Sequence, residues 1–360
     1  MSHLEERLEH DLTEIRDQIA DLGSKAEQAM DGALRALHTA DDNLAFTTIL
    51  SDLPINRQMR KIDRMCHSFI AVHLPSAGHL RLISSVIRAN IILERIGDYA
   101  VTIARESVQL GDIPEGYMSA ELKSIGAESM SVLSESISAF TTSNAKRARE
   151  AKALAQRVEH DMDGIYAELL DSCEESGAGC SRHTLIYLII FSQLKRVSDQ
   201  AKNLAEETIF VETGETKAPK VYRILFVDKD SRCLAPMAQL IANKIFPDAG
   251  VYTHAGAQVA DALDSNMVSF MRERGFDLAG IHPAPLDSDR ESLSEYHVVV
   301  GLNQQVQAAV GKVPFRTSAL NWQDLEVPSG DDRDGWEDLH KSMALQIREL
   351  LTLLRGPENL

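Results

Sequence analysis

The chain has 360 residues, of which 44% are hydrophobic, 25% are charged and only 5% are aromatic. This length predicts two or three domains, each able to bury its own core. The low aromatic content favours helices packed through Ala and Leu over a β-sandwich. The formal net charge is −17, and no concentrated basic face is evident in the sequence, so we expect no direct binding to nucleic acid.

The sequence also argues against membrane insertion and secretion. The longest strongly apolar run, residues 184–191, is far shorter than the roughly 20 residues that cross a bilayer. The first residues lack the basic and apolar regions of a signal peptide, so we expect no leader. The cysteines show no C-x-x-C spacing, which favours free thiols in a reduced cytoplasmic compartment. They are Cys66, Cys173, Cys180 and Cys233.

The first 213 residues are predicted to form long helices. Between Leu4 and Leu37, apolar residues recur at spacings of three and four, the pattern of a helix with one buried face. Further helices are expected over 44–71 (with Pro54 as a kink near its start), from 79 to beyond 106 and ending before Gly111, and over 119–140, 144–173 and 185–211. Short turns, such as Gly177-Ala178-Gly179, favour antiparallel packing, so we expect two three-helix bundles over 1–113 and 114–213.

The two sets of helices share an internal repeat. Leu93-Glu94-Arg95-Ile96-Gly97-Asp98-Tyr99-Ala100 aligns with Leu194-Lys195-Arg196-Val197-Ser198-Asp199-Gln200-Ala201 and matches at Leu, Arg, Asp and Ala. In the first copy, Glu94 and Asp98 lie four residues apart and therefore on one helix face. The repeat indicates two similar helical units in tandem.

Several motifs occur along this region in a fixed order. They are Asp52-x-x-x-Asn56, Ile62-Asp63-x-x-Cys66, Pro75-x-Ala77-x-x-Leu80-Arg81 and Glu94-Arg95-Ile96-Gly97-Asp98, then Glu159-x-x-x-Asp163, Asp199, Asn203 and Glu206. Together they resemble the two repeats of the PhoU family of phosphate-signalling regulators. The resemblance implies a cytoplasmic homodimer that damps phosphate uptake and phosphate-starvation signalling. Its partners would be the ATPase of the phosphate ABC transporter and the membrane-bound sensor kinase, which would hold it peripherally at the inner membrane.

Members of that family can hold metal ions on E/D-x-x-x-D patches, where facing carboxylates supply hard oxygen ligands. The resemblance implies a divalent or ferric ion (iron, zinc, manganese or magnesium) on the bundles. Its candidate ligands are Asp63, Glu94, Asp98, Glu159, Asp163, Asp199, Asn203 and Glu206. The chain departs from the pattern at Met59, Thr102, Arg105 and Lys195. The alternative is a solvated acidic face with ion pairs, favoured in the second repeat because the Lys195 ammonium would compete with a metal.

Residues 214–219 are predicted to be a linker, and the chain changes in character after it. Strands are expected over 221–227 and 298–302, with helices over 236–245, 259–274 and 336–354. Strands that alternate with helices predict a parallel α/β sheet over residues 220–357. The expected fold class is therefore an all-α double three-helix bundle followed by an α/β domain.

Parts of this second region resemble the low-molecular-weight tyrosine phosphatase and arsenate reductase fold. They are Ile224-Leu225-Phe226-Val227, Pro236-Met237-Ala238-Gln239, Ala255-Gly256, 274–280 and His297-Val298-Val299-Val300. Active members need a loop thiolate that attacks phosphorus, an arginine six residues later, and backbone N–H groups at a helix N-terminus. They also need an Asp before a Pro as general acid.

The chain departs from that chemistry in three roles. Asp228 occupies the nucleophile position, Leu234 the arginine position, and Val327 the position of the general acid. The degenerate phosphate loop consists of Asp228, Lys229, Asp230, Ser231, Arg232, Cys233 and Leu234. A carboxylate in place of the thiolate repels a phosphate dianion, so we predict a pseudophosphatase without catalytic residues.

Two other enzyme classes begin with a similar loop. Asp228-x-Asp230 after an apolar strand also resembles haloacid-dehalogenase-type phosphatases, in which the first Asp attacks beside Mg²⁺, although Arg232 stands where they have Thr or Val. A response-regulator receiver would need a phosphoacceptor Asp where the chain has Ile281-His282-Pro283. A Mg-dependent phosphohydrolase and a metal-binding helical bundle are the alternatives to a regulator.

Overall fold

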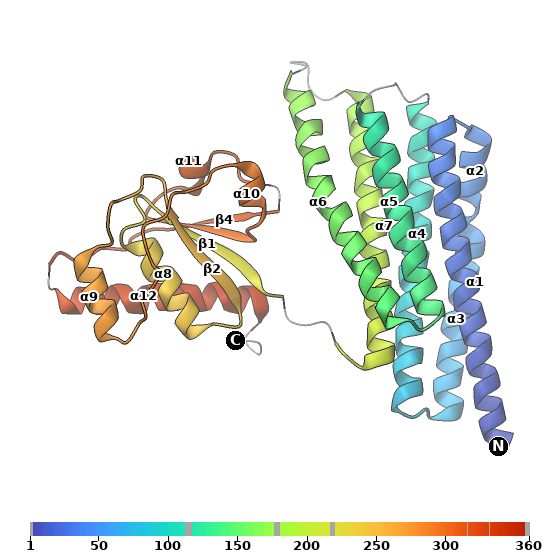
Figure 1. The fold of residues 1–360 in the computed structure, drawn as a ribbon. Helices are drawn as coiled ribbons and strands as arrows, with labels where there is room; N and C mark the ends of the chain where they lie inside the picture. Colours follow the sequence, from blue (N-terminus) through green and yellow to red (C-terminus); the bar gives the residue numbers. More distant parts are fainter. Residues whose placement is uncertain are drawn as a thin grey trace. The chain divides into compact units, whose positions relative to one another are not determined.

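The computed structural model of the chain describes residues 3–111, 117–175, 181–216, 220–314, 316–330 and 332–356. The chain divides into two compact units, Met1–Lys217 and Ala218–Leu360 (Figure 1). The first unit is helical and the second is an α/β domain, which confirms the predicted fold class. The expected turn at 177–179 and residues 217–219 of the expected linker lie outside the described residues.

The first unit is built from long helices. They are α1 (His3–Thr39), α2 (Asp42–Leu50), α3 (Asp52–His73), α4 (Ala77–Leu110), α5 (Tyr117–Thr141), α6 (Ala145–Glu175) and α7 (Arg182–Thr213). Helices α1, α3 and α4 pack on one another, as do α5, α6 and α7 (Figure 1). The periodicity predicted the core correctly, since Leu12, Ile15, Ile19 and Leu22 are all buried.

The expected single helix over 44–71 is wrong, because the chain is interrupted at Ser51 between α2 and α3. Pro54 has no N–H to offer Leu50, so a continuous helix would lose a hydrogen bond there. Ser51 instead ends α2, with its Oγ donating to the carbonyl of Thr48 at 2.6 Å. Pro54 then falls in the first turn of α3, where its missing N–H costs little.

Helices α4 and α7, which carry the repeated motif, are joined by a charged contact. The Oε1 atom of Glu207 accepts a hydrogen bond from Arg88 Nε at 2.6 Å, and its Oε2 accepts one from Ser85 Oγ at 2.7 Å. Ser85 is buried and the Glu207 side chain is only 18% exposed. The contact therefore ties the first repeat to the second.

The second unit is a four-stranded parallel sheet with strand order β2-β1-β3-β4. Its elements are β1 (Tyr222–Asp228), α8 (Leu234–Ile245), β2 (Gly250–Gly256), α9 (Ser265–Glu273), α10 (Arg290–Ser294), β3 (Val298–Leu302), α11 (Val306–Val310), β4 (Ser318–Trp322) and α12 (Arg333–Arg355). The strands lie beside α8, α9 and α12 (Figure 1). Strands β2 and β4 were not predicted, and α9 begins at Ser265, later than the predicted start at residue 259.

Helix α9 begins at Ser265 because Asp264 caps it, accepting hydrogen bonds from the N–H groups of Asn266 and Met267. Among the described residues, no helix is both long and apolar enough to cross a membrane. Cys66 and Cys233 are free thiols, but Cys173 is in a disulfide, so the expectation of a free thiol at Cys173 is wrong. Sequence spacing could not test whether two sulfur atoms meet in the fold.

Candidate functional site

The degenerate phosphate loop lies at the C-terminal end of the central strand β1. Asp228 is the last residue of β1, and α8 begins at Leu234. This is the edge of a parallel sheet at which α/β proteins bind their ligands. Asp228 is only 4% exposed, so its carboxylate points into the loop and away from solvent.

Three backbone N–H groups donate hydrogen bonds to the Asp228 carboxylate. Oδ1 accepts from Ser231 at 2.5 Å and from Asp230 at 3.2 Å, and Oδ2 accepts from Ala235 at 2.9 Å. Ala235 lies in the first turn of α8, whose N–H groups have no partners within the helix. The loop therefore folds around a carboxylate of its own chain, in the way such loops fold around a bound anion.

Burial and hydrogen bonding act on Asp228 in opposite directions. Burial is the larger effect and raises the pKa of this carboxyl, while the N–H groups of Ala235 and Ser231 stabilise the charged form and oppose it. The nearby Asp230 carboxylate adds a smaller upward effect. A phosphate dianion entering here would meet donors already in use and a second negative charge.

The rest of the loop is held by contacts that leave little room for a ligand. Ser231 has a φ of 57° and is fully buried, and its Oγ accepts a hydrogen bond from the Ala284 N–H at 3.0 Å. A Cβ on Gly256, at the end of β2, would collide with the backbone of Ser231. The Arg232 guanidinium lies 3.4 Å from the Asp264 carboxylate. Only Lys229 projects freely from the loop as an exposed cation.

The remaining catalytic positions are also apolar or inert. Leu234 is 5% exposed and packs in the core beneath the sheet, so it offers no donor to an anion. Val327, in the place of the general acid, is 47% exposed. Burial raises the pKa of the Cys233 thiol, and the carboxylates of Asp264 and Asp228 raise it further. The thiol is therefore protonated and a poor nucleophile at neutral pH.

In the first helical repeat, the structure brings Glu94 and Asp98 together with a residue outside the predicted set, Asp52. The pKa of Glu94 is raised by partial burial and then by the charges of Asp98 and Asp52. The pKa of Asp98 is raised by partial burial, then by the charge of Asp52 and a hydrogen bond with it. The sequence feature that could have identified Asp52 is the motif Asp52-x-x-x-Asn56. In the structure, Asn56 Nδ2 donates a hydrogen bond to Asp52 Oδ2 at 2.9 Å.

Asp63, by contrast, is not linked to that cluster by any contact between described residues. Its carboxylate lies 3.5 Å from Nδ1 of His67, one turn further along α3. Asp63 stands eleven residues after Asp52, which corresponds to about 16 Å along a helix. Glu94 and Asp98 therefore lie near Asp52 and not near Asp63.

In the second repeat, lysines neutralise three of the predicted ligands. Asp199 is 2.7 Å from Lys195, Glu206 is 3.1 Å from Lys152, and Glu159 is 3.7 Å from Lys202. Asp163 and Asn203 lie on α6 and α7 and are half-buried. Each ammonium group competes with a cation for the carboxylate that it contacts.

The arrangement of these carboxylates does not fit a metal ion. Within residues 3–111, 117–175 and 181–216, no three His, Cys, Asp or Glu side chains form a group that could hold one. The side chains as placed, with lysines on the second repeat, do not fit the predicted metal centre. Its metal remains a prediction from the family resemblance.

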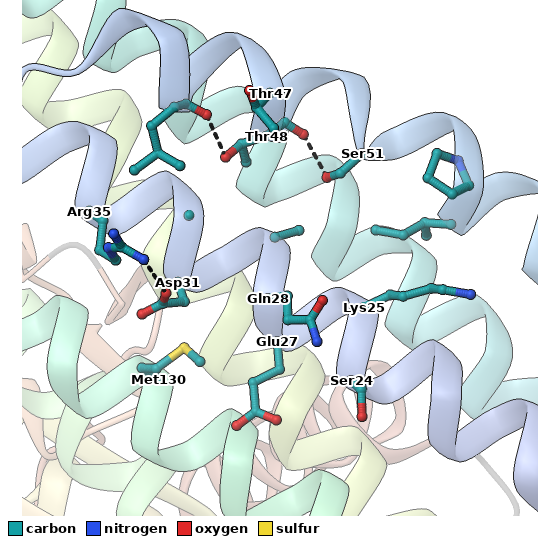
Figure 2. Close-up of a pocket in the computed structure, with 15 residues that line it drawn as sticks. Ser24, Lys25, Glu27, Gln28, Asp31, Arg35, Thr47, Thr48, Ser51 and Met130 are labelled. Carbon is teal, nitrogen blue, oxygen red and sulfur yellow. Dashed lines mark hydrogen bonds and ion pairs between the residues drawn. The ribbon is translucent and has the colours of Figure 1, made fainter.

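The first unit also has a groove lined by residues of α1, α2 and the start of α3, with Met130 of α5, and its volume is about 780 Å³ (Figure 2). Its cations are already engaged: Arg35 lies 3.7 Å from Asp31, and Lys25 lies 2.6 Å from Asp21. The hydroxyl groups of Thr48 and Ser51 donate to carbonyl oxygens of α2, as the dashed lines in Figure 2 show. The groove thus offers an anion few free donors.

Fold and site together define a class of protein: two tandem helical repeats fused to a phosphatase-like domain whose loop contains a carboxylate in place of the thiolate. The PhoU domain model matches residues 19–107 and 122–208, and the low molecular weight phosphotyrosine protein phosphatase model matches residues 223–351. The phosphate-specific transport system accessory protein PhoU homolog of Pseudomonas aeruginosa is 31% identical over 215 residues, which are 59% of this chain and 88% of the relative. The chain belongs to the PhoU family.

Other relatives agree with this assignment. PhoU of Escherichia coli is 26% identical over 213 residues, covering 59% of this chain and 88% of that protein. The crystal structure of PhoU from Pseudomonas aeruginosa superposes with a TM-score of 0.55 at 30% identity, covering 57% of this chain and 99% of that one. PhoU from Streptococcus pneumoniae gives a TM-score of 0.54 at 25% identity, covering 59% and 99%.

Proposed function

We propose that the chain is a phosphate-responsive regulator that lowers phosphate uptake and phosphate-starvation signalling. The proposal is supported by the match of both helical repeats to proteins named as accessory proteins of the phosphate-specific transport system. Its partners are the ATPase of the phosphate ABC transporter and the phosphate sensor kinase. The regulator is a cytoplasmic homodimer that reaches the inner membrane only through these partners.

We further propose that the phosphatase-like domain is a binding module without catalytic activity. This proposal is supported by the buried carboxylate of Asp228, which accepts hydrogen bonds from three N–H groups that would otherwise be available to a bound phosphate. A nucleophile must face its substrate and must gain reactivity from its surroundings. Asp228 faces the inside of its own loop, and Leu234 supplies none of the charge stabilisation that phosphoryl transfer needs.

The test is co-purification from phosphate-replete cells, with full-length protein compared with the first unit alone. The helical unit has its own core, so a truncation after residue 217 keeps that core intact. Recovery of the transporter ATPase or the sensor kinase by both forms supports the regulator. Recovery by full-length protein alone would assign the specificity to the phosphatase-like domain. Recovery by neither form would contradict the proposal.

The second candidate is a Mg-dependent phosphohydrolase that uses Asp228 and Asp230. The Asp-x-Asp sequence at the end of β1 favours it, and the enclosure of the Asp228 carboxylate opposes it. Hydrolysis of an aryl phosphate in the presence of Mg²⁺, abolished by Asp228→Asn, would establish this enzyme. If the chain is a regulator without catalytic activity, wild type and Asp228→Asn should both fail to hydrolyse the aryl phosphate.

The third candidate is a metal-binding bundle. The cluster of Asp52, Glu94 and Asp98 favours it, because burial and the neighbouring carboxylates raise the pKa values of Glu94 and Asp98, which Arg95 opposes only in part at Glu94. Against it, no three acidic, His or Cys side chains among the described residues form a group that could hold a metal. Purified protein would then carry a stoichiometric transition metal that Asp98→Ala removes. The lysine contacts of the second repeat predict that this repeat contributes no tightly bound metal.

A further inference from the structure

Helix α3 exposes a row of cations that the sequence analysis did not detect. We call Arg57, Arg60, Lys61 and Arg64 the basic face. All four side chains are exposed, and none forms an ion pair with a described residue. At 3.6 residues per turn, positions 57, 60, 61 and 64 share one side of the helix. The expectation that the chain has no concentrated basic face is therefore wrong for α3.

The acidic residues of α3 lie at the edges of the basic face, where the Asp63 side chain is still 46% exposed and contacts His67. The exposed residues of α3 are Leu53, Arg57, Arg60, Lys61, Arg64, His67, Ser68, Ala71 and Val72, and none is Asp or Glu. The two acidic residues of α3, Asp52 and Asp63, are half-buried at its edges. Arg60 Nε donates to the Asn56 carbonyl at 3.2 Å, but no carboxylate among the described residues neutralises any of the four cations, so in a chain with a net charge of −17 they keep their charge for a ligand.

Exposed apolar side chains lie at both ends of this row. Phe46 and Leu50 on α2 are 51% and 65% exposed, and Leu53 on α3 is 56% exposed. Their spacing of four and three residues places them on the side of α2 and α3 that carries the basic face. At the other end, Val72 is 52% exposed. From Leu53 to Val72 the face is about 28 Å long, which is comparable with one dimension of a protein–protein interface.

We propose that this face of α2 and α3 is the surface on which the regulator binds an acidic surface of its protein partner. The inference rests on the proposed function, since it assigns a surface to the partner contact. Three of the four cations are arginines, whose planar guanidinium groups pair with carboxylates through two hydrogen bonds and are enriched at protein interfaces. Phe46, Leu50 and Leu53 supply apolar area beside them, as interface cores require.

An anionic membrane fits the same face less well. Adsorption to lipid headgroups needs no bidentate geometry, and the chain's overall charge of −17 opposes its approach to a negative surface. The apolar side chains also lie at the ends of the row, whereas a helix that lies in a membrane needs an apolar stripe along its whole length.

The test measures binding of the full-length protein to the purified transporter ATPase and to the cytoplasmic part of the sensor kinase. The variant carries Arg57→Glu, Arg60→Glu, Lys61→Glu and Arg64→Glu. A control carries the same change in charge on exposed cations of other helices, namely Arg16→Glu, Arg105→Glu, Lys123→Glu and Arg157→Glu. If the charge reversal impairs folding, the same four positions are changed to Gln.

We expect the variant to bind its partner at least about tenfold more weakly, with the control within about twofold of wild type. Wild-type binding should also weaken between about 50 and about 200 mM NaCl, and the Gln variant should lose most of this dependence. Equal effects of variant and control, or no effect of either, would overturn the proposed surface while leaving the regulator intact.

Two other outcomes would overturn the inference in different ways. If wild type binds neither partner, the proposed function fails together with its surface. If wild type binds vesicles with about 30% phosphatidylglycerol, and the variant loses that binding but keeps its protein partner, the face is a lipid contact.

Discussion

The Asp228 carboxylate and the backbone N–H of Ala235 lie 2.9 Å apart, which joins the last residue of β1 to the first turn of α8. The N-terminus of a helix carries a partial positive charge and attracts an anion. Here the anion is the side chain of Asp228, so the N–H groups of the loop surround a carboxylate of the same chain. The donors of the loop are already used by this carboxylate, which is the basis for the proposal that the domain is not catalytic.

Removal of this carboxylate should open the cradle to an external anion. In Asp228→Ala, three N–H groups lose their acceptor, and we expect the domain to be destabilised by about 1–3 kcal/mol in a buffer without oxyanions. Phosphate or sulfate that binds the vacated position should restore part of this loss, because a ligand of the folded state stabilises it. The measurement is thermal unfolding of wild type and variant with and without phosphate.

Asp230→Ala is the matched control for this experiment. Asp230 is in the same loop, but its side chain accepts only from the Arg232 N–H, at 3.2 Å. We expect phosphate to stabilise neither this control nor wild type. Stabilisation of wild type by phosphate equal to that of Asp228→Ala would show that the cradle is open in the native protein.

The carboxyl cluster on α3 and α4 predicts a dependence on pH. The pKa values of Glu94 and Asp98 are raised in the folded state, so the folded protein binds these protons more tightly than the unfolded chain. Below the ordinary carboxyl pKa of about 4, both groups are protonated in the folded and the unfolded chain, and the cluster does not lower the free energy of unfolding. As the pH rises through the raised pKa values, the charged cluster lowers the free energy of unfolding increasingly. Glu94→Gln should stabilise the helical unit at pH 7 and have less effect at pH 4.

Because these side chains are partly exposed, the gain at pH 7 should be small, about 0.5 kcal/mol, and smaller still in high salt. Urea unfolding at the two pH values measures it. Asp171→Asn removes a charge from an exposed position of α6 outside the cluster and serves as the control. A Glu94→Gln protein that is less stable than wild type at pH 7 would indicate that a bound cation normally compensates the cluster.

The contact of Glu207 with Arg88 and Ser85 should contribute to the stability of the helical unit. Glu207→Ala removes a charged acceptor and leaves the buried Ser85 O–H without an acceptor, while Ser85 Oγ still accepts from Arg88 Nη2 at 3.1 Å. We expect a loss of about 1–3 kcal/mol in the free energy of unfolding. A double-mutant cycle with Arg88→Ala measures the part due to the pair, and additive single effects would show that the two side chains are not coupled.

The free thiols should react slowly in the folded protein. Burial raises the pKa of Cys66 to about 12, with a smaller contribution from Asp63, and it raises the pKa of Cys233 as well. A rise of about three units lowers the thiolate fraction roughly 1000-fold at a given pH. Labelling with a chromogenic disulfide at pH 8 should be slow until denaturant is added. Rapid labelling of native Cys233, identified by peptide mapping, would contradict the inert loop.

The sequence predicted those elements whose burial pattern is strong. The buried residues of α1 follow a helical period, and β1 and β3 contain continuous apolar runs. Strand β2 was missed because it begins and ends with Gly and contains Thr253 and His254 in its middle. Strand β4 is at the edge of the sheet and is largely exposed, so selection for apolar residues leaves little trace there.

The site could be predicted only as far as residue types allow. The replacement of the thiolate by Asp228 is visible in the sequence, but the fold of the carboxylate back onto its own loop depends on the left-handed backbone of Ser231. The meeting of Asp52 with Asp98 likewise depends on the antiparallel register of α3 and α4, which no local pattern specifies. The basic face of α3 was hidden because Asp63 interrupts it in sequence, although this residue lies at the edge of the face in the folded helix.

The central claim is that this chain restrains phosphate uptake as a regulator. Its most direct test is uptake of radiolabelled phosphate by phosphate-replete cells that lack the gene, compared with cells that carry wild-type protein on a plasmid. The account predicts faster uptake in the deletion strain and a return to the parental rate with wild type. Uptake that is unchanged by the deletion would contradict the account.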